Sequence, residues 1–542
     1  MVIGARGVSL DGIMPSQTLT PSRLSVRDLC IVAAVYLLSF LFLLGFPHPL
    51  PGFPLDDSWI HQVVARNLAH DGTLGFIPGV RSSGSSSLLW SFLLAANWKF
   101  LPAMSPVVYS GLLSGFLLIA TGWGLLAMAR KDGLPETSCW IWALTPALSG
   151  NFMWLGAVGM EHVLFVALSV VGVYLWFQES LRSAAGCAIC LGALSLTRPE
   201  GMVLAVLVVL GSRWARRGRR DIFIVISAVG VCVLASLTAN FVTSHSWLPT
   251  TYAGRKWLYF GTEKVPFLAR IVFPYTLARN ILHPWAIRQT HILYFVSAIV
   301  LIFTAIGVWD LFHARRVRTS FLCTWSFVHI GIYAVMLPSR SHGGRYQPLF
   351  LALSFPLMYL GVEIVVRRIS QSFHAPRPRA LFQATAMLVC LLGGLFSLKV
   401  WREVTRDGII AIEMSHGKMG EFLVDTLPPQ SRVASFDIGR IGYIYGGRLV
   451  DLGGLTDSSL LPYMREHRLM DYLAERDIPY FVWPSNPDGG SGVPQVLDLT
   501  PQIRRKITTL ASFCAPGDAW AISYAATTDA APCQTLYQFN SR

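Results

Sequence analysis

Long apolar stretches, separated by short polar or basic segments, dominate the first 400 residues of the chain. Several are about as long as the ~20 residues that a helix needs to cross a bilayer. The pattern therefore predicts a polytopic α-helical membrane protein. The candidate spans are residues 28–46, 86–104, 107–129, 138–152, 162–178, 184–197, 200–212, 221–243, 290–312, 320–337, 346–366 and 380–401.

Basic residues cluster in three segments between these stretches and indicate on which side of the membrane each loop lies. The clusters lie at Arg213–Arg220, Arg315–Arg318 and Arg367–Arg379. Because positively charged loops stay on the cytoplasmic side, these clusters are predicted to be cytoplasmic. Counting outward then places the other loops and the carboxyl-terminal part of the chain on the opposite side. The predicted external segments are residues 47–85, 244–289, 338–345 and everything after 402.

The number of membrane crossings must be consistent with a cytoplasmic amino terminus and an external carboxyl-terminal part. Twelve full crossings cannot connect a cytoplasmic start with an external end, so one candidate is re-entrant, interfacial or half of a crossing. The short stretches 138–152 and 184–212 fit this role best, because Arg198-Pro199-Glu200 interrupts the latter. We therefore expect about eleven transmembrane helices, given the length that one crossing needs.

Composition divides the chain into three parts. Residues 1–27 are predicted to be a cytoplasmic amino-terminal arm and residues 28–401 the transmembrane body. From residue 402 the apolar stretches shorten, turn signals multiply, and short β-type stretches alternate with helical patterns. Residues 402–542 are therefore predicted to form an extracytoplasmic α/β domain. The β-type stretches are 432–436 and 480–483, and the helical patterns are 415–427 and 461–477.

The cysteines follow the same division. Cys187 and Cys190 have the spacing of a redox motif, but they lie inside an apparent span, so buried thiols are the better interpretation. Cys514 and Cys533 lie in the predicted external domain. There a disulfide and two free thiols are both compatible with the sequence.

The net charge of +14 would suit a nucleic-acid-binding protein, but the rest of the composition does not. Hydrophobic residues make up 53% of the chain and charged residues only 14%. The basic residues sit mostly between spans, where membrane topology explains them. We therefore expect membrane lipids as partners, and no nucleic acid.

The first external segment carries an acidic pair, Asp56 and Asp57, directly before a helical pattern. Apolar residues recur at helical spacing from Trp59 to Leu68, which predicts an amphipathic helix lying along the membrane surface. One aspartate could cap this helix. Capping needs only one carboxylate, so the second indicates a further role.

Other polar side chains occupy outward or membrane-interrupting positions. Arg198 with Glu200, or Glu161 with a nearby arginine, could form purely structural ion pairs, because ionisable groups at membrane depth are costly when unpaired. The external cations could likewise hold lipid headgroups. Taken together, however, carboxylates and guanidinium groups are what a site needs to deprotonate a hydroxyl and bind a phosphate. The candidates are Glu161, Arg198, Glu200, Tyr252, Arg255, Lys256, His342, Arg345 and Tyr346.

Several short motifs follow one another along the chain. They are the Asp56-Asp57 pair, Gly159-Met160-Glu161, Arg198-Pro199-Glu200-Gly201, Leu248-Pro249-Thr250-Thr251, Gly344-Arg345-Tyr346, Phe436-Asp437-Ile438-Gly439 and Val450-Asp451-Leu452-Gly453-Gly454. Their order resembles that in the polyprenyl-phosphate-sugar-dependent glycosyltransferases of the GT-C fold. The cell-wall arabinofuranosyltransferases are most similar, and protein O-mannosyltransferases and lipid A aminoarabinose transferases are more distant. Two stretches depart from the family pattern: Ser85-Ser86-Ser87, where relatives tend to have a proline, and Gly254-Arg255-Lys256, where an Ala-Lys is expected.

The resemblance implies a fold, a reaction and a location. It implies a GT-C-like membrane body with a carboxyl-terminal extracytoplasmic α/β domain, in a bacterial inner (cell) membrane. The active site and that domain would face the periplasm or exterior. The reaction would be inverting transfer of a sugar from a polyprenyl-phosphate donor to a hydroxyl of a glycan, lipid or protein acceptor. This agrees with the sequence, because Gly439 and Gly442 do not form a dinucleotide-binding fingerprint.

The resemblance also implies roles for the candidate residues. Asp56 would be the base and Asp57 would orient it or bind the acceptor, or the two would act in the reverse order. The donor phosphate would be bound by Arg198, Arg255, Lys256, His342 and Arg345, and the rest of the substrate by Glu161, Glu200, Tyr252 and Tyr346.

The same roles bear on cofactors. Arginine and lysine can neutralise a leaving monophosphate, so no cofactor or metal is required. A divalent cation on Asp57 and Glu161 stays compatible with the sequence.

Two other functions fit some of these features. A transporter or flippase for lipid-linked sugars would also keep charged residues in the membrane, although transport sites tend to lie near the bilayer midplane. A noncatalytic glycan-binding protein would use only the external domain. Within that domain, the stretch from Asp437 to Asp457 would contact the acceptor, or would simply pack over the site.

Overall fold

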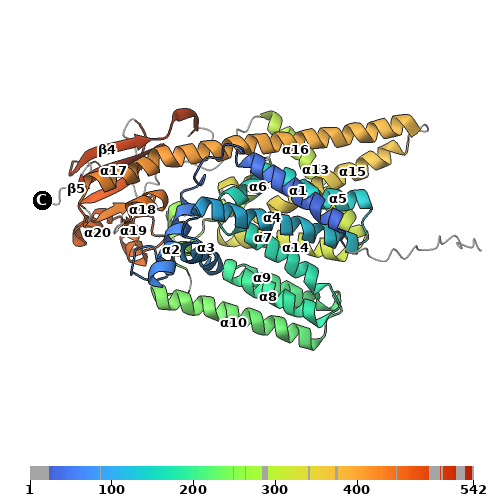
Figure 1. Ribbon diagram of the computed structural model, residues 1–542, viewed down its shortest axis with the longest axis horizontal. Coiled ribbons are helices and arrows are strands. Elements are labelled where there is room, and N and C mark those ends of the chain that lie inside the picture. Colours follow the sequence, from blue (N-terminus) through green and yellow to red (C-terminus); the bar gives the residue numbers. More distant parts are fainter. Residues whose placement is uncertain are drawn as a thin grey trace, which may run out of the picture.

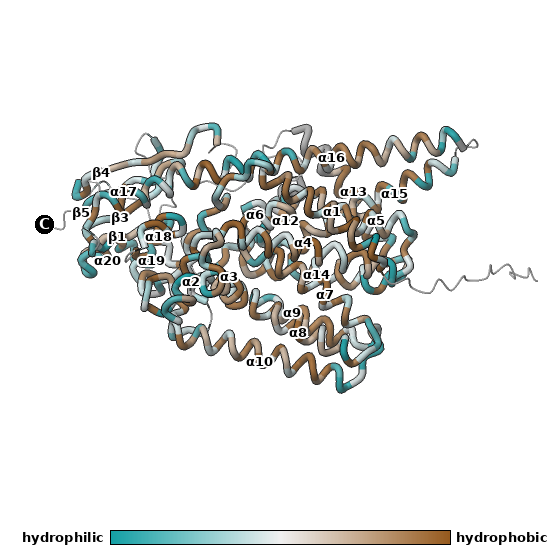
Figure 2. The backbone as a smooth tube through the Cα atoms, viewed as in Figure 1, coloured by the Kyte–Doolittle hydropathy of each residue, from teal (hydrophilic) through white to brown (hydrophobic). Residues whose placement is uncertain are grey.

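The computed structural model consists of a helical bundle and a smaller α/β domain, with one long helix, α16 (Pro376–Ile412), extending along both (Figure 1). Hydrophobic residues dominate the bundle helices, and polar residues are more frequent in the α/β domain and in the loops at the far end of the bundle (Figure 2). The structure describes residues 24–82, 84–85, 87–247, 249–262, 264–282, 291–339, 342–372, 376–428, 430–446, 449–487, 501, 505–519 and 531–539. Most of the predicted amino-terminal arm lies outside the described residues.

The predicted apolar stretches are largely helical in the structure, and the helical bundle confirms the predicted fold class. Besides α16, its helices are α1 (Val26–Leu43), α2 (Asp57–Asp71), α3 (Leu88–Phe100), α4 (Pro106–Lys131), α5 (Glu136–Leu144), η1 (Thr145–Leu148), α6 (Gly150–Ala157), α7 (His162–Trp176), α8 (Leu181–Thr197), α9 (Gly201–Leu210), η2 (Gly211–Arg213), α10 (Arg219–Ser244), α11 (Thr250–Phe260), α12 (Phe267–Leu282), α13 (His291–His313), α14 (Val317–Met336), η3 (His342–Gly344) and α15 (Pro348–Ser370).

The protein is a multi-pass membrane protein. Among the described residues, six helices are long and apolar enough to cross a membrane, or seven if α6 and α7, bent by 114° against each other, form one broken span. Shorter apolar helices accompany them, including α8 and α9. The expected number of about eleven crossings, which rests on the length that a crossing needs, stays a prediction.

Three segments differ from their predicted form. The stretch 138–152 is not one helix, because Pro146 lies in the 3₁₀ turn η1 between α5 and α6. The stretch 86–104 forms only the 13-residue helix α3. The helix after the acidic pair, α2, does not lie exposed along the membrane surface. Trp59, His61 and Gln62 are all buried, because α2 is packed between α3 and the α/β domain.

The predicted cytoplasmic loops lie together at one end of the bundle. Arg217 donates to the carbonyl oxygens of Trp176 and Ser180. Arg318 donates to the carboxylate of Asp132, which also accepts the backbone N–H of Thr319 at the start of α14. These bonds satisfy helix ends that would otherwise leave backbone groups unpaired. The α/β domain lies at the opposite end of the bundle (Figure 1). The predicted cytoplasmic and external sides stay a prediction.

Small residues allow close helix contacts inside the bundle. The helices α13 and α15 cross where Gly307 and Gly361 face each other's backbone. A Cβ added at Gly361 would lie 1.9 Å from the carbonyl oxygen of Phe303. In a bilayer, where lipid tails are as apolar as leucine, such close packing is a main source of helix association.

The α/β domain contains a five-stranded mixed sheet in the order β2-β1-β3-β5-β4. The strand β1 pairs in parallel with β2 and β3, and β5 pairs antiparallel with β3 and β4. Buried Tyr472, Phe481 and Trp483 belong to its core. Its elements are η4 (Glu413–Gly417), α17 (Lys418–Thr426), β1 (Val433–Ser435), α18 (Gly439–Tyr445), β2 (Leu449–Asp451), η5 (Ser458–Leu460), α19 (Leu461–Arg465), α20 (Leu469–Glu475), β3 (Tyr480–Ser485), β4 (Ile507–Cys514) and β5 (Cys533–Phe539).

The predicted boundary at residue 402 falls inside α16, which continues to Ile412 and then through the π-helical turn η4 into α17. The bundle and the sheet are therefore joined by helix rather than by a flexible linker. Cys514 and Cys533, at the ends of β4 and β5, form a disulfide. Cys187 is buried and free.

We predict that the double substitution Cys514→Ser and Cys533→Ser lowers the free energy of unfolding of the α/β domain by roughly 3 kcal/mol, the value expected for a loop of this length. Thermal unfolding in detergent micelles, with and without reductant, measures the change. Cys30→Ser, at an exposed free cysteine, is the matched control. Equal melting temperatures for the double variant and the wild type would contradict the prediction.

Candidate functional site

The start of α2 holds the acidic pair at the junction between the bundle and the α/β domain. Asp56 occupies the N-cap position of α2 but makes no side-chain hydrogen bond to that helix. Its two carboxylate oxygens instead accept the backbone N–H groups of Gly439, at 2.8 Å, and Arg440, at 2.7 Å. Asp56 therefore caps α18, a helix nearly 400 residues later in the chain.

This cap requires very close contact between the two parts of the protein. A Cβ added at Gly439 would lie 2.0 Å from the carbonyl oxygen of Asp56. A second close contact lies beside it, where a Cβ added at Gly254 in α11 would lie 2.4 Å from the carbonyl oxygen of Gly454. Segments of the α/β domain thus form part of the site's walls.

Acidic and basic groups surround Asp56. Its carboxylate, the Asp437 carboxylate and a ring nitrogen of His416 all lie within 4.8 Å of one another. Burial raises the pKa of Asp56 to about 6, and the charge of Asp437 acts in the same direction. His416 and the two backbone N–H groups oppose this shift.

Asp57 faces a different set of groups. Its carboxylate lies 2.7 Å from the guanidinium of Arg345 and 3.9 Å from that of Arg255. Burial alone would raise the pKa of Asp57, but the charges of Arg345, Arg255 and His342 hold that pKa well below its usual range. The carboxylate of Asp57 is therefore ionised and paired with the guanidinium groups of Arg345 and Arg255.

Tyr346 supports both guanidinium groups. Arg255 and Arg345 lie 5.6 and 5.5 Å from the centroid of its ring, within the range of cation–π contacts. The Tyr346 hydroxyl lies 2.9 Å from that of Tyr259 in α11. The structure thus brings together Asp57, Arg255, His342, Arg345 and Tyr346. The phosphate-binding role predicted for Arg255, His342 and Arg345 stays a prediction.

A second, deeper network contains the other predicted residues. Arg198 donates to Glu200 at 2.7 Å, lies 3.5 Å from Glu161, and also donates to the hydroxyl of Tyr333. The Tyr333 hydroxyl in turn donates to Glu200 at 2.8 Å. Arg198 therefore has several protein partners, and the ion pairs considered above as a purely structural alternative are present for both glutamates.

Sequence reasoning missed four members of this network: His61, His162, His329 and Tyr333. The Nε2 atom of His61 lies 3.6 Å from Glu161, and that of His329 lies 3.6 Å from Glu200. His61 could have been found, because it is four residues after Asp57 and so shares a face of α2 with it. His329 and Tyr333 lie within an apolar span, and only the tertiary structure reveals them.

Two predicted residues have contacts elsewhere. The Nζ atom of Lys256 lies 4.7 Å from the ring centroid of Tyr252. The Tyr252 hydroxyl donates to the carbonyl oxygen of Met336 at 3.4 Å. These contacts are with neighbouring residues rather than with the acidic pair.

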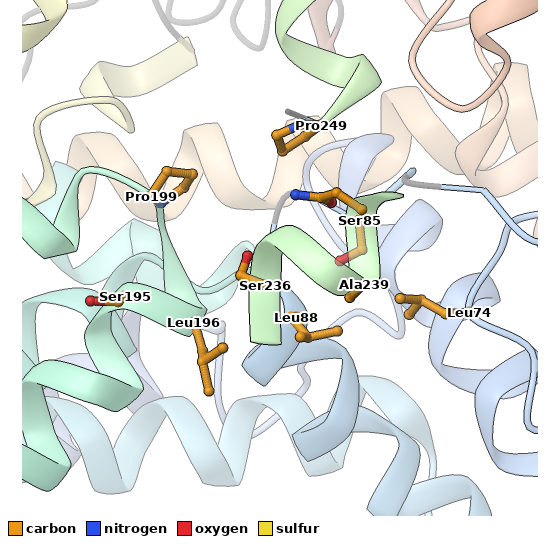
Figure 3. Close-up of a pocket in the computed structure, with 10 residues that line it drawn as sticks. Leu74, Ser85, Leu88, Ser195, Leu196, Pro199, Ser236, Ala239 and Pro249 are labelled. Atoms are coloured by element: carbon orange, nitrogen blue, oxygen red, sulfur yellow. The ribbon is translucent and has the colours of Figure 1, made fainter. Parts of the chain in front are cut away.

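A small pocket is lined in part by Pro199, the residue between Arg198 and Glu200 in the sequence (Figure 3). It is walled by the start of α3, the end of α8, the helix α10 and the segment before α11. Apolar groups, hydroxyls and one amide line it, and none of its described lining residues has an ionisable side chain. The lining residues are Leu74, Ser85, Leu88, Ser195, Leu196, Pro199, Ser236, Ala239, Asn240 and Pro249.

The side chains that lie close enough together to hold a metal ion are not the pair considered in the sequence analysis. In the part of the chain that the structure describes, the group that could hold a metal ion is Asp56, His416 and Asp437. Asp57 and Glu161, the pair considered there, each face arginine side chains.

Comparison of the structure with solved structures decides the fold. The crystal structure of ArnT from Cupriavidus metallidurans bound to undecaprenyl phosphate superposes with a TM-score of 0.52 and 11% sequence identity, over 95% of this chain and 98% of ArnT. The apo form of ArnT gives a TM-score of 0.50, 11% identity and coverages of 94% and 98%. The chain has the GT-C fold.

Other comparisons add less to this assignment. Arabinofuranosyltransferase AftD from Mycobacteria matches at 18% identity and a TM-score of 0.47, over 96% of this chain and 42% of AftD. A family model described as a domain of unknown function, DUF8728, matches residues 407–537. No curated protein matches the chain in sequence. The family model spans the α/β domain, and the GT-C fold includes both parts of the chain.

We predict that Gly439→Ala separates the α/β domain from α2, because its Cβ would overlap the backbone of Asp56. The expected loss of stability is more than about 2 kcal/mol, as for other severe steric conflicts in buried contacts. Thermal unfolding and limited proteolysis of α16 measure it. Gly517→Ala is the control, since a Cβ at Gly517 meets nothing within 4 Å. If both variants melt like the wild type, Gly439 is not a required contact.

Proposed function

We propose that this protein is an integral membrane glycosyltransferase. It moves a sugar, arabinofuranose, mannose or a similar one, from a polyprenyl-phosphate donor to an acceptor hydroxyl, with inversion at the anomeric carbon. One observation carries the proposal: the adjacent carboxylates of Asp56 and Asp57 face two different environments within a GT-C fold. Asp57 faces guanidinium groups, and Asp56 faces the α/β domain.

The donor phosphate is proposed to bind on the Asp57 side. Arg345 and Arg255 offer guanidinium N–H groups that suit phosphate oxygens, and Tyr346 holds both of them. Arg345 is buried and has more donor groups than Asp57 alone can use. ArnT, which shares the fold, was solved with undecaprenyl phosphate bound, and this supports a lipid phosphate as the donor's leaving group.

The acceptor is proposed to approach on the Asp56 side. Inverting transfer needs the attacking hydroxyl and the leaving phosphate on opposite faces of the sugar ring. Adjacent residues at a helix start point in directions about 100° apart, which separates the two carboxylates accordingly. Asp56, which no arginine side chain pairs with among the described residues, would take the hydroxyl's proton as the new glycosidic bond forms.

The deeper network would position the donor side rather than touch the substrate. Arg198 is paired with Glu200 and Glu161, and His61 connects Glu161 to the face of α2 that carries Asp57. Removing one partner from such a buried network leaves an uncompensated charge, which is costly. We therefore assign Arg198, Glu161 and Glu200 a supporting role in place of direct contact with phosphate.

The site would face outward from a bacterial inner (cell) membrane. The basic loops and the α/β domain lie at opposite ends of the bundle, and the positive-inside rule assigns the basic end to the cytoplasm. Sugar transfer would then take place on the extracytoplasmic side, at the same end as the α/β domain.

We predict that the wild type, in proteoliposomes, consumes one member of a panel of labelled polyprenyl-phosphate sugars and releases polyprenyl phosphate. Asp56→Asn should lower kcat by about a hundredfold or more, the contribution typical of a general base, with donor KM nearly unchanged. Asp471→Asn, at an exposed ion pair, is the control.

The same assay separates the competing functions. If Asp57→Asn abolishes turnover and Asp56→Asn does not, the base is Asp57. Passage of intact donor lipid across the membrane without transfer would assign the protein to transporters instead. Glycan binding by the wild type without consumption of any donor would indicate a noncatalytic role.

We predict that Arg255→Ala weakens donor binding roughly tenfold, because a charge-assisted hydrogen bond contributes about 1.5–3 kcal/mol. Donor KM and inhibition by free polyprenyl phosphate both report this change. Arg367→Ala, at a partly exposed arginine near the other end of the bundle, should leave both values unchanged. An unaltered KM in Arg255→Ala would remove Arg255 from the donor site.

A further inference from the structure

The cluster of Asp56, His416 and Asp437 is assembled from three separate segments of the chain. Asp56 precedes α2, His416 lies in the π-helical turn η4, and Asp437 lies between β1 and α18. His416 is buried, with 3% of its surface exposed. A π-helical turn inside a longer helix is rare and often occurs at functional sites. Here it directs His416 toward two carboxylates that belong to other elements.

The separations in this cluster suit a shared cation better than direct hydrogen bonds. The Nε2 atom of His416 lies 3.4 Å from a carboxylate oxygen of Asp437, and all three donor atoms lie within 4.8 Å of one another. Two ligands bound tetrahedrally at about 2.1 Å from a metal are separated by about 3.4 Å. The arrangement therefore leaves room for one ion at the centre.

The charges also favour a cation. Arg440 contacts Asp56 through its backbone N–H, but its guanidinium is bound elsewhere: it donates to Glu413 at 2.7 and 3.0 Å and lies 4.1 Å from the ring centroid of Trp59. Two carboxylates thus share their site with a single imidazole. A proton on His416 would supply one positive charge, and a divalent ion would balance both carboxylates.

Further side chains surround these ligands in a way that suits a metal site. The Ser415 hydroxyl lies 2.8 Å from Nδ1 of His416, which fixes the ring and leaves Nε2 toward the cluster. The amide nitrogen of buried Gln534 lies 2.8 Å from Asp437 and 3.2 Å from His416. Its Oε1 atom is buried without a hydrogen-bond partner among the described residues. Turning this amide by 180° would present Oε1 to the ion as a fourth ligand.

We propose that Asp56, His416 and Asp437 bind one divalent transition-metal ion, of the Zn²⁺ or Mn²⁺ class, at the junction between the membrane body and the α/β domain. Imidazole with carboxylate ligands favours this class over Ca²⁺ or Mg²⁺, which prefer oxygen alone. The inference stands on the geometry of the cluster and does not depend on the proposed transferase activity.

Such an ion is compatible with the role proposed for Asp56. Each carboxylate oxygen of Asp56 has two lone pairs and accepts one backbone N–H with one of them, so one lone pair on each oxygen is left for an ion and for a proton. The ion would also offer a position for an acceptor hydroxyl and make that hydroxyl easier to deprotonate. Its position between three segments would further tie the α/β domain to α2.

The proposal is tested by adding metal back to the full-length protein in detergent after chelator has removed any bound metal. The wild type should bind about one Zn²⁺ or Mn²⁺ per chain, measured by elemental analysis. Bound Co²⁺ should give the visible absorption of a site with a nitrogen ligand. His416→Gln and Asp437→Asn should each lower the affinity at least tenfold. His70→Gln and Asp471→Asn, at exposed positions, are the matched controls.

A fourth substitution keeps the test decisive if a ligand variant fails to fold. Gln534→Glu adds a carboxylate to the cluster, so it should tighten metal binding and make folding stability depend more strongly on the metal. Binding that is absent in the wild type, unchanged in all cluster variants, or confined to Ca²⁺ and Mg²⁺ would overturn the proposal. Sugar transfer by protein shown to be metal-free would support the transferase assignment whatever the outcome for the metal site. Metal binding without sugar transfer would support the metal site and contradict the transferase assignment.

Discussion

The site depends on one contact: the carboxylate of Asp56 caps α18 of the α/β domain. The contact aligns a charged group with the exposed N–H groups of a helix start, which is a favourable position for an anion. It also fixes the distance between two parts of the chain that are remote in sequence. Because Gly439 has no side chain, its backbone can approach the backbone of Asp56 to form this cap. Everything proposed for the acceptor side follows from that approach.

The surrounding membrane body imposes a second constraint, because charges inside it must be balanced. Arg198 illustrates this: it is nearly buried, and two glutamates and a tyrosine hydroxyl surround its guanidinium. Buried networks of this kind are costly to break but contribute little net stability compared with apolar packing. The Arg198 network between α7, α9 and α14 is therefore better explained by positioning the Asp57 side of the site than by a contribution to stability.

The sequence was enough to predict the fold class, with a helical membrane body and a carboxyl-terminal α/β region at the end of the bundle opposite to the basic loops. Apolar length and basic loops carry that information directly, since both reflect the cost of moving polar groups into lipid. The sequence also singled out Asp57, Arg255 and Arg345, which the structure brings together, because charged residues beside the predicted spans are few. Their roles stay predictions. The sequence could not show that α2 is buried, since its burial depends on a domain that begins more than 300 residues later.

For the same reason His416, Tyr333 and Gln534 escaped prediction. Each lies in a segment whose pattern is ordinary for its element: a helix end, an apolar span and a strand. Their chemistry arises only when tertiary structure brings them to partners from other elements. Spacing along the chain reveals groups that share one helix face, as with Asp57 and His61, and reveals nothing about groups that meet across elements.

The two carboxylates explain why a consecutive pair of aspartates is useful here. A single residue at the start of α2 could either cap the α/β domain or pair with the arginines, because the two sets of groups lie in different directions. Two consecutive residues reach both with no change in the backbone. Each carboxylate then has its own electrostatic environment: arginine charges keep Asp57 ionised, whereas burial and a neighbouring carboxylate disfavour charge on Asp56. A site that must hold an anion on one side and receive a proton on the other needs this division, and adjacency in sequence is the simplest way to provide it.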